Sequence, residues 1–350
     1  MRLRRIDIKN FRCFTKQTFD VDGHIVVVQG ANGTGKSSFL EALHYLCYLR
    51  SFRASSPRDL VRFDQESFFL KTEFTFEDQD VPQQLQVGFS QKKRLVKLNK
   101  KNITSFKELM DYYRVVTITE DNLNLITGGP EIRRRFIDQA IMLENQEYPL
   151  QIREYRKILV HRNSLLANRN RSREQVSFWT EQLWSKSKLI EKLRKKLLVG
   201  LQTGVNRMLN EIFDEPIDIS VEYKPKKREI SKELLDLEYR YGRSLFGAHL
   251  DDILISFQNK KSKSFASRGQ QKLTVLLFKV AQLERLEVQR GQAVLLLDDF
   301  MTDFDDKKIT VLVEFLGSLK NQLLFTSPSR KTSFDQAIAQ FNVKYLKLTI

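Results

Sequence analysis

The run Gly30–Ser38, with the sequence GANGTGKSS, constrains the fold of this chain more than any other segment. A glycine, four residues of any type and then Gly-Lys-Ser is the pattern of a phosphate-binding loop. Its glycines let the backbone turn tightly, so that successive N–H groups point at phosphate oxygens. The apolar run Ile25–Gln29 predicts a buried parallel strand before the loop, and Ser38–Leu49 predicts a helix after it. A chance glycine-rich turn would not require this strand–loop–helix context.

The loop predicts a site for ATP and Mg²⁺. We expect the Lys36 ammonium to reach the β- and γ-phosphates and to act in catalysis, and the Ser37 hydroxyl to bind Mg²⁺. The predicted ATP-binding residues are the whole loop: Gly30, Ala31, Asn32, Gly33, Thr34, Gly35, Lys36, Ser37 and Ser38.

An apolar run that ends in two acids, Ala293–Asp299 with the sequence AVLLLDD, has the pattern of a Walker B strand. Asp298 is the predicted second ligand of Mg²⁺, and Asp299 is the predicted general base that polarises the attacking water. The alternative is an ordinary buried strand followed by acids, and the phosphate-binding loop upstream favours the metal site.

A second anion-binding pattern precedes that strand. Within Phe265–Lys272, FASRGQQK, the residues Ser267, Gly269 and Gln270 match the core of the ABC ATPase signature. A serine hydroxyl and glycine amides at a predicted helix N-terminus present donors to a γ-phosphate. In ABC ATPases that phosphate belongs to the opposite subunit, so these three residues are expected to act in trans.

Apolar periodicity separates strand-rich and helical regions. Alternation predicts antiparallel strands at Leu3–Phe11, Ser67–Phe76, Leu85–Phe89 and Arg94–Leu98. From Pro130 to about Phe213, apolar residues recur instead at helical spacing.

Charge favours a polyanionic partner. The 350 residues include 59 Lys and Arg against 43 Asp and Glu, a net charge of +16. A generally basic, solvated surface is the alternative.

Two cysteines, Cys13 and Cys47, do not make a disulfide framework, and both are expected in the core. We find no apolar leader or membrane segment and expect a soluble, cytoplasmic protein.

Two arginine-rich segments have two interpretations each. Arg50-Ser51-Phe52-Arg53 could grip phosphate and base or form a solvated loop, and the basic segment from Arg162 to Arg173 could contact nucleic acid or be an exposed helix end.

The motifs together resemble the RecF family of SMC-like ABC ATPases nearly from end to end. The resemblance rests on NFR at Asn10–Arg12, the phosphate-binding loop, RSFR, FASRGQQK and LLLDD. It also rests on TEDNLNLITGGPEIRRRFID at Thr119–Asp138 and YRKILVHRNSLL at Tyr155–Leu166, which are more specific to the family than the nucleotide motifs.

The resemblance implies an α/β fold: an ABC-type ATPase head formed by residues 1–128 and 246–350, with a mainly helical lobe at residues 129–245 and no long coiled coil. It implies a weak, DNA-stimulated ATPase that dimerises on ATP and clamps DNA at single-strand/double-strand junctions. It also implies a RecR-like partner and a role in loading the recombinase. The predicted DNA contacts are Arg50, Arg53, Arg133, Arg134 and Arg162.

Three positions depart from the family pattern. Leu250 replaces an arginine, Phe304 replaces a leucine in the D-loop before Asp305, and Thr326 stands where many ABC ATPases place a switch histidine. The D-loop dimer contact is expected to persist through Asp305.

Rival classes fit less well. An SMC protein would insert a long coiled coil, but only 230 residues separate Ser37 from Ser267. The basic charge and the missing histidine argue against an ABC transporter subunit. A P-loop small-molecule kinase would not need the signature, and a purely structural DNA-binding module would not need Lys36 or Asp298.

Overall fold

The computed structural model describes residues 1–76, 79–91, 93–168, 172–213, 216–226, 229–327 and 332–349. The chain forms two compact units, of which the first is Met1–Asn122 with Leu283–Ile350 and the second is Leu123–Gln282. The ATPase head and inserted lobe were expected to divide at residues 128 and 246. These predicted boundaries describe functional domains, whereas the two units are defined by packing alone. The predicted boundaries therefore stay a prediction.

A five-stranded parallel sheet forms the centre of the first unit, with the strand order β14-β3-β13-β12-β8. Its strands are β3 (Ile25–Gln29), β8 (Val115–Ile118), β12 (Val294–Leu297), β13 (Leu323–Ser327) and β14 (Val343–Lys347). Strands β3 and β12 are mostly Val, Leu and Ile, and β13 begins Leu-Leu-Phe, as is typical of a sheet that is buried on both faces. One strand, β13, therefore lies between the strand before the phosphate-binding loop and the strand before the two acids.

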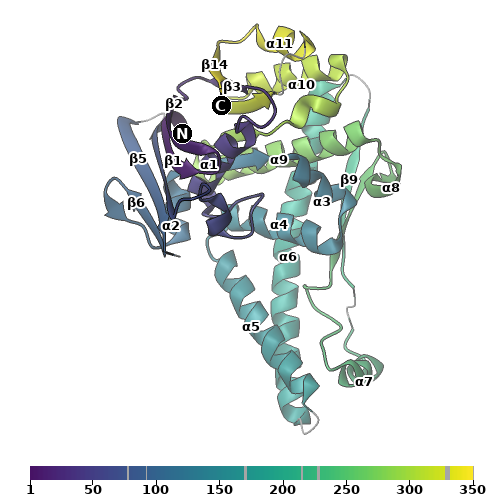
Figure 1. Cartoon of the computed structure of the whole chain (residues 1–350). Coiled ribbons are helices and arrows are strands. Elements are labelled where there is room, and N and C mark those ends of the chain that lie inside the picture. Colours follow the sequence, from purple (N-terminus) through teal and green to yellow (C-terminus); the bar gives the residue numbers. More distant parts are fainter. Residues whose placement is uncertain are drawn as a thin grey trace. The chain divides into compact units, whose positions relative to one another are not determined.

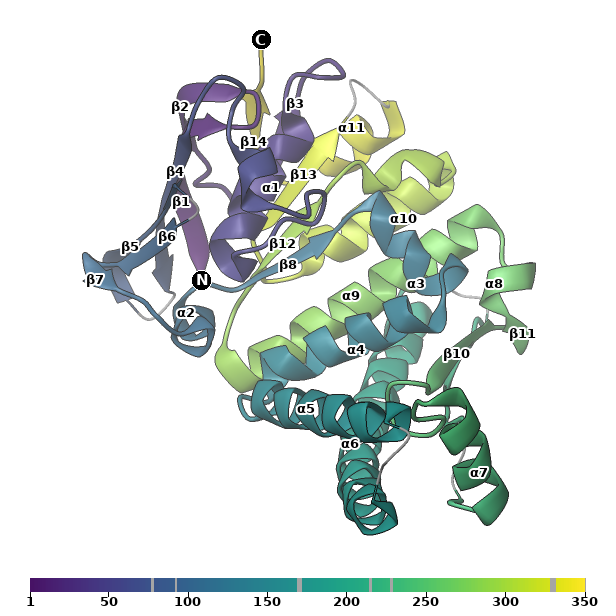
Figure 2. The ribbon, with the colours of Figure 1, turned by 60° about the horizontal axis from the view of Figure 1, so that its bottom comes forward.

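A six-stranded antiparallel sheet accompanies it, with the order β2-β1-β4-β5-β6-β7. Its strands are β1 (Arg2–Phe11), β2 (Phe14–Asp20), β4 (Ser67–Phe76), β5 (Gln79–Ser90), β6 (Lys93–Leu98) and β7 (Lys101–Asn102). The four strands predicted from alternation are confirmed as β1, β4, β5 and β6. Helix α1 (Lys36–Tyr48) contacts β1 and β5 of this sheet and β8 and β13 of the parallel sheet, and Figure 2 shows it between the two.

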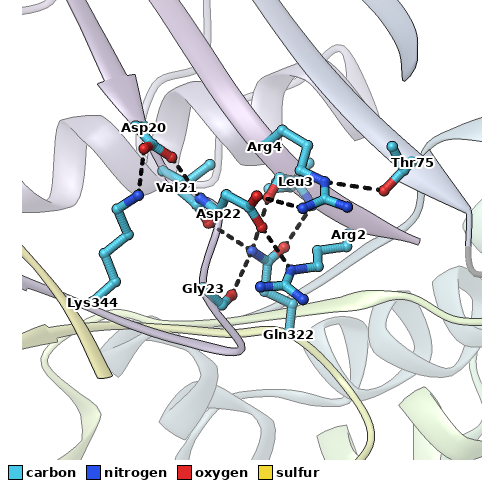
Figure 3. Close-up of polar contacts among 10 residues, drawn as sticks. All are labelled: Arg2, Leu3, Arg4, Asp20, Val21, Asp22, Gly23, Thr75, Gln322 and Lys344. Carbon is cyan, nitrogen blue, oxygen red and sulfur yellow. Dashed lines mark hydrogen bonds and ion pairs between the residues drawn. The ribbon is translucent and has the colours of Figure 1, made fainter. Parts of the chain in front are cut away.

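Gln322, just before β13, ties the start of that strand to the antiparallel sheet (Figure 3). Its side-chain oxygen Oε1 accepts from the Leu3 amide at 2.7 Å. Its Nε2 lies 3.0 Å from the Leu3 carbonyl oxygen, 2.8 Å from that of Val21 and 2.9 Å from that of Gly23. Because Gln322 is buried, losing these partners would leave polar groups unsatisfied in the core.

Short helices complete the first unit. They are η1 (Pro57–Leu60), α2 (Phe106–Tyr112), η3 (Phe300–Asp303), α10 (Asp306–Ser318) and α11 (Thr332–Ile338). Helix η2 (Glu120–Leu123) lies at the passage to the second unit.

The second unit is mainly helical, as its periodicity predicts (Figure 1). Its helices are α3 (Asn124–Thr127), α4 (Pro130–Glu144), α5 (Tyr148–Ala167), α6 (Arg173–Ile212), α7 (Lys232–Tyr241), α8 (Ser262–Phe265) and the first part of α9 (Arg268–Arg290). A small antiparallel sheet has the order β11-β10-β9, with β9 (Ile219–Lys224), β10 (Asp252–Phe257) and β11 (Lys260–Lys261). The 40 residues of α6 span about 60 Å and pack against α5. None of the helices in the described ranges combines the length and apolar character needed to cross a membrane.

Candidate nucleotide-binding site

The loop between β3 and α1 has a backbone in the left-handed region at two of its positions, Gly33 and Gly35. Gly35 has φ +94°, in the left-handed region. A Cβ at Gly35 would lie 2.5 Å from the Cys13 sulfur, and one at Gly30 would lie 2.4 Å from Thr34 Oγ1 and 2.8 Å from the Leu348 carbonyl oxygen. The glycines of the motif are therefore required by tight packing as well as by the turn.

Lys36 is folded back over the loop. Its Nζ donates to the carbonyl oxygens of Gly30 at 3.0 Å and Ala31 at 3.2 Å, and its side chain is buried. The tip of the loop, from Ala31 to Gly33, is exposed. The ammonium thus lies within the curve of the loop, where a phosphate group would meet it.

The acid after β12 lies beside the loop's serine. Asp298 is buried, and the Ser37 side chain lies close enough to its carboxylate to act on its pKa. Burial raises the pKa of Asp298, while the Thr326 hydroxyl, the Ser37 side chain and the charge of Arg53 act in the opposite direction. The two residues that were predicted to share Mg²⁺ from the two motifs therefore lie close together.

Thr326, near the end of β13, bridges both acids. Its hydroxyl donates to Asp298 Oδ1 at 2.9 Å and accepts from the Asp299 backbone N–H at 2.8 Å. Asp299 has φ +46°, so the chain turns sharply directly after Asp298. Sequence reasoning treated Thr326 only as the position of a missing histidine. Its contact with the acids depends on the strand order β3-β13-β12, which the sequence pattern does not reveal.

We expect Thr326→Val to lower the rate of ATP hydrolysis about tenfold while ATP affinity changes little. Valine keeps the shape but leaves buried Asp298 and the Asp299 amide without this partner, a loss of about 1–3 kcal/mol. Steady-state hydrolysis and calorimetric ATP binding measure the two effects. Thr326→Ser retains the hydroxyl and is the control. Equal rates for the valine variant and the native protein would contradict the positioning role.

The signature residues begin helix α9 in the second unit. The Ser267 amide donates to Gln270 Oε1 at 2.8 Å, and the Gln270 amide lies 3.3 Å from Ser267 Oγ, so the two side chains cap the helix start reciprocally. Ser267 is exposed, and the nearby Phe265 is 68% exposed. The trans contact of Ser267, Gly269 and Gln270 stays a prediction.

The predicted DNA-contacting arginines lie in different environments. Arg50 and Arg53 are exposed in the loop after α1, and the charge of Arg53 acts on the pKa of Asp298. Arg134 is half-buried and donates to the Asp251 carbonyl oxygen at 2.6 Å. For these three arginines the DNA contact stays a prediction.

For Arg133 the predicted DNA contact is wrong. Its side chain is buried and donates to Asp252 Oδ1 at 2.8 Å and Oδ2 at 3.0 Å. A third bond, of 2.8 Å, reaches the Gly128 carbonyl oxygen. The guanidinium therefore joins α4 to β10 and is not available to a phosphate.

For Arg162 the predicted DNA contact is also wrong, because its side chain is completely buried. It pairs with Glu238 at 2.5 Å, donates to Thr180 Oγ1 at 3.0 Å and to Ser244 Oγ at 2.7 Å, and lies over the Phe246 ring. Arg162, the first residue of the basic segment, is therefore a structural residue that connects α5, α6 and α7. Part of that segment, residues 169–171, lies outside the described residues.

We expect Glu238→Ala to destabilise the second unit by about 3–5 kcal/mol, because it leaves the buried Arg162 charge without its carboxylate. Urea unfolding monitored by circular dichroism measures the loss. Glu222→Ala, at an exposed carboxylate of β9, is the control and is expected to change stability by less than about 1 kcal/mol. A Glu238→Ala protein as stable as that control would show that the Arg162–Glu238 pair adds little to the free energy of unfolding.

The cysteines differ in burial. Cys47 is in the core as predicted, where burial raises the pKa of its thiol to about 12. The core position predicted for Cys13 is wrong, because Cys13 is exposed. Its sulfur lies against Gly35 of the loop.

The other two positions that depart from the family pattern, Phe304 and Leu250, make contacts that stabilise the local structure. Asp305 caps α10 by accepting from the Lys308 amide at 2.9 Å, and Phe304 is buried near Phe300. Leu250 closes a turn by donating its amide to the Gly247 carbonyl oxygen at 2.9 Å. The Asp305 dimer contact stays a prediction.

The glycine loop before α1, the proximity of its serine to Asp298 and the parallel sheet define the class of P-loop ATPase heads. A family model, the RecF/RecN/SMC N-terminal domain, matches residues 2–347. The chain belongs to this family and, within it, to the RecF proteins.

Individual relatives are similar to this chain over more than nine tenths of their length. The chain is 30% identical over 337 residues to "DNA replication and repair protein RecF" of Leptospira interrogans, covering 93% of this chain and 92% of the relative. It is 27% identical over 345 residues to the RecF protein of a Thermoanaerobacter species, covering 93% and 94%.

Solved structures give the same fold. A structure described as the recombination mediator protein RecF with ATP in the RecFOR pathway superposes with a TM-score of 0.81 at 27% identity, covering 95% of this chain and 93% of that one. The Smc head domain of Pyrococcus furiosus superposes with a TM-score of 0.58 at 14% identity and shows the fold alone. The prediction of an ABC-type ATPase head without a long coiled coil is confirmed.

Proposed function

We propose that this protein is an ATP-dependent, DNA-binding mediator of recombinational repair. The observation that carries the proposal is the proximity of Ser37 of the phosphate-binding loop to Asp298 after β12, with Thr326 bridging to Asp299. The relatives named for DNA replication and repair, and the ATP-bound recombination mediator, support the same function.

ATP is the proposed substrate of the loop Gly30–Ser38. Lys36 neutralises the β- and γ-phosphates, since it lies in the curve of the loop. Ser37 and Asp298 offer the oxygen ligands that Mg²⁺ prefers, and the ion would neutralise phosphate charge there. Asp299, positioned through Thr326, orients the attacking water and accepts its proton.

A second copy of the chain completes the site in this proposal. Ser267, Gly269 and Gln270 present the start of α9 to the γ-phosphate held by the partner, and Asp305 adds a dimer contact. The exposure of Ser267 and Phe265 supports a surface that is covered on association. ATP then joins the two copies, and loss of the γ-phosphate separates them.

The proposed partners are gapped or junction DNA, with single- and double-stranded parts, and a RecR-like mediator protein, in the cytoplasm. The net charge of +16 is the physical support for DNA, because each phosphate contact releases a counterion. The complex is proposed to help load the recombinase onto the single strand.

Binding of duplex, single-stranded and gapped DNA, each with and without ATP, tests the function. We expect ATP to increase retention on DNA and the affinity to fall about 10³-fold from low to moderate salt, if roughly six to ten phosphates are contacted. An affinity that does not change with salt would contradict phosphate binding. Phosphoryl transfer to a small molecule without DNA binding would instead indicate the P-loop kinase alternative.

A further inference from the structure

One row of residues crosses the outer face of the antiparallel sheet. The strand register places Lys16 of β2 opposite Lys9 of β1, Lys9 opposite Phe69 of β4, Phe69 opposite Gly88 of β5 and Gly88 opposite Leu95 of β6. Residues directly opposite one another share a face of a sheet, so all five lie on the same side. At about 4.8 Å between strands, the row spans about 19 Å.

The apolar residues of this row face solvent. Phe69 is 37% exposed and Leu95 is 51% exposed, whereas their chain neighbours Phe68, Leu70 and Val96 are buried on the opposite face. Between them Gly88 has no side chain, and a Cβ placed there would lie 3.9 Å from the Phe69 ring. The Phe69 ring and the Leu95 side chain therefore lie on either side of a position without a side chain, which we call the slot.

Basic residues surround the slot. Lys93 and Lys97 of β6 share the face of Leu95, since side chains alternate along a strand. None of the four lysines Lys9, Lys16, Lys93 and Lys97 has an acidic partner among the described residues. We call these four, with Phe69, Gly88 and Leu95, the Phe69 face.

The acids on the same side of the sheet whose side chains the structure describes are already paired. Asp7 lies 3.1 Å from Arg5 and 3.9 Å from Lys71, and Glu73 lies 3.2 Å from Lys71. Asp20 pairs at 2.5 Å with Lys344. The Phe69 face therefore carries an excess of positive charge that pairs inside the protein do not neutralise.

We propose that the Phe69 face binds single-stranded nucleic acid. An unstacked base lies on the Phe69 ring over the slot at Gly88, and the lysines on both sides bind the flanking phosphates. A duplex cannot supply this contact, because its base faces are already stacked. An acidic protein would satisfy the lysines but would leave the aromatic slot without a specific occupant. The proposal rests on the proposed function and adds to it a surface for the single-stranded part of a junction.

Fluorescence anisotropy with a labelled oligo(dT), in the absence of ATP, tests the aromatic contact on the full chain. We expect Phe69→Ala to weaken binding about tenfold or more, because it removes one stacking platform. Phe69→Trp keeps a ring at this position and is expected to bind at least as well as the native protein. Phe69 lies at the surface, so thermal melting of both variants should stay unchanged.

The lysines are tested through salt. Lys9→Gln with Lys16→Gln should reduce the slope of log affinity against log salt by about 1.4, since each phosphate contact on a single strand contributes about 0.7. Lys307→Gln with Lys320→Gln removes the same charge from exposed positions elsewhere in the first unit and is the matched control. Crosslinking of 5-iodouracil DNA followed by peptide mapping is expected to place the adduct on Phe69.

The outcomes separate this surface from the proposed function. Loss of oligo(dT) binding in Phe69→Ala, with ATP-dependent retention on duplex unchanged, would support the Phe69 face. Unchanged oligo(dT) affinity in Phe69→Ala would overturn it while DNA binding itself stands. An equal change of the salt slope in the two lysine double variants would do the same. A native protein that binds neither duplex nor single strand would overturn both, and tighter binding of an acidic peptide than of oligo(dT) would assign the face to a protein partner.

Discussion

Replacing Lys36 by alanine is expected to weaken ATP binding about 10²-fold and to abolish hydrolysis. The ammonium lies inside the loop, bonded to the Gly30 and Ala31 carbonyl oxygens, and it is the cation that the β- and γ-phosphates would meet. Hydrogen bonds between charged groups contribute about 1.5–3 kcal/mol each, so losing them together accounts for an effect of this size. Isothermal calorimetry with a non-hydrolysable ATP analogue measures it.

Asp299→Asn is the matched comparison for Lys36→Ala. Asparagine cannot accept the proton from water, but it leaves Lys36 and the loop unchanged, so this variant is expected to bind ATP at native affinity and to hydrolyse it slowly. Because Lys36 also bonds to the loop, thermal melting of both variants checks that the fold is intact. Native ATP affinity in Lys36→Ala would refute the assignment of the phosphate-binding loop.

Replacing Ser267 by arginine is expected to abolish ATP-dependent dimerisation and hydrolysis together while each copy still binds ATP. Ser267 is exposed and caps the start of α9, where arginine would fill the space and remove the hydroxyl donor. The loop from Gly30 to Ser38 is untouched by the change. Light scattering with and without ATP measures dimerisation, and calorimetry measures nucleotide binding.

Ser318→Arg, at an exposed serine in the last turn of α10, adds the same charge away from the signature and is the control. Because arginine strengthens non-specific attraction to DNA, DNA binding of both arginine variants must be measured separately. Dimerisation at native strength in Ser267→Arg would show that the signature is a chance match. Loss of ATP binding itself would place Ser267 in its own copy's pocket and refute the trans arrangement.

Local patterns were sufficient for the elements that repeat a simple period. The alternation of Ser67–Phe76 predicts β4 at its observed bounds, and the spacing of apolar residues from Pro130 onward predicts the α4, α5 and α6 helices. Strand β2 was missed because it is an edge strand with mostly exposed residues, and such a strand lacks alternation. Strand β10 was missed as well, although its burial alternates, since its sequence DILISF carries few polar residues.

The nucleotide motifs were readable because their chemistry depends on consecutive residues. Gly30, Gly35 and Lys36 act through one turn of backbone, and a helix start such as Ser267 to Gln270 is likewise a local structure. The sequence by itself therefore determined the site class, the family and the main secondary structure. None of these needs information on which segments, distant in the chain, become neighbours.

Only the tertiary structure decided which charged residues are available to a ligand. Arg162 and Arg133 carry the same charge as Arg50, but they bury it against Glu238 and Asp252, which lie 76 and 119 residues away in the chain. The role of Thr326 and the row through Phe69 likewise depend on strand order and register. Burial and pairing are set by contacts between distant segments, and a linear pattern of charge does not encode them.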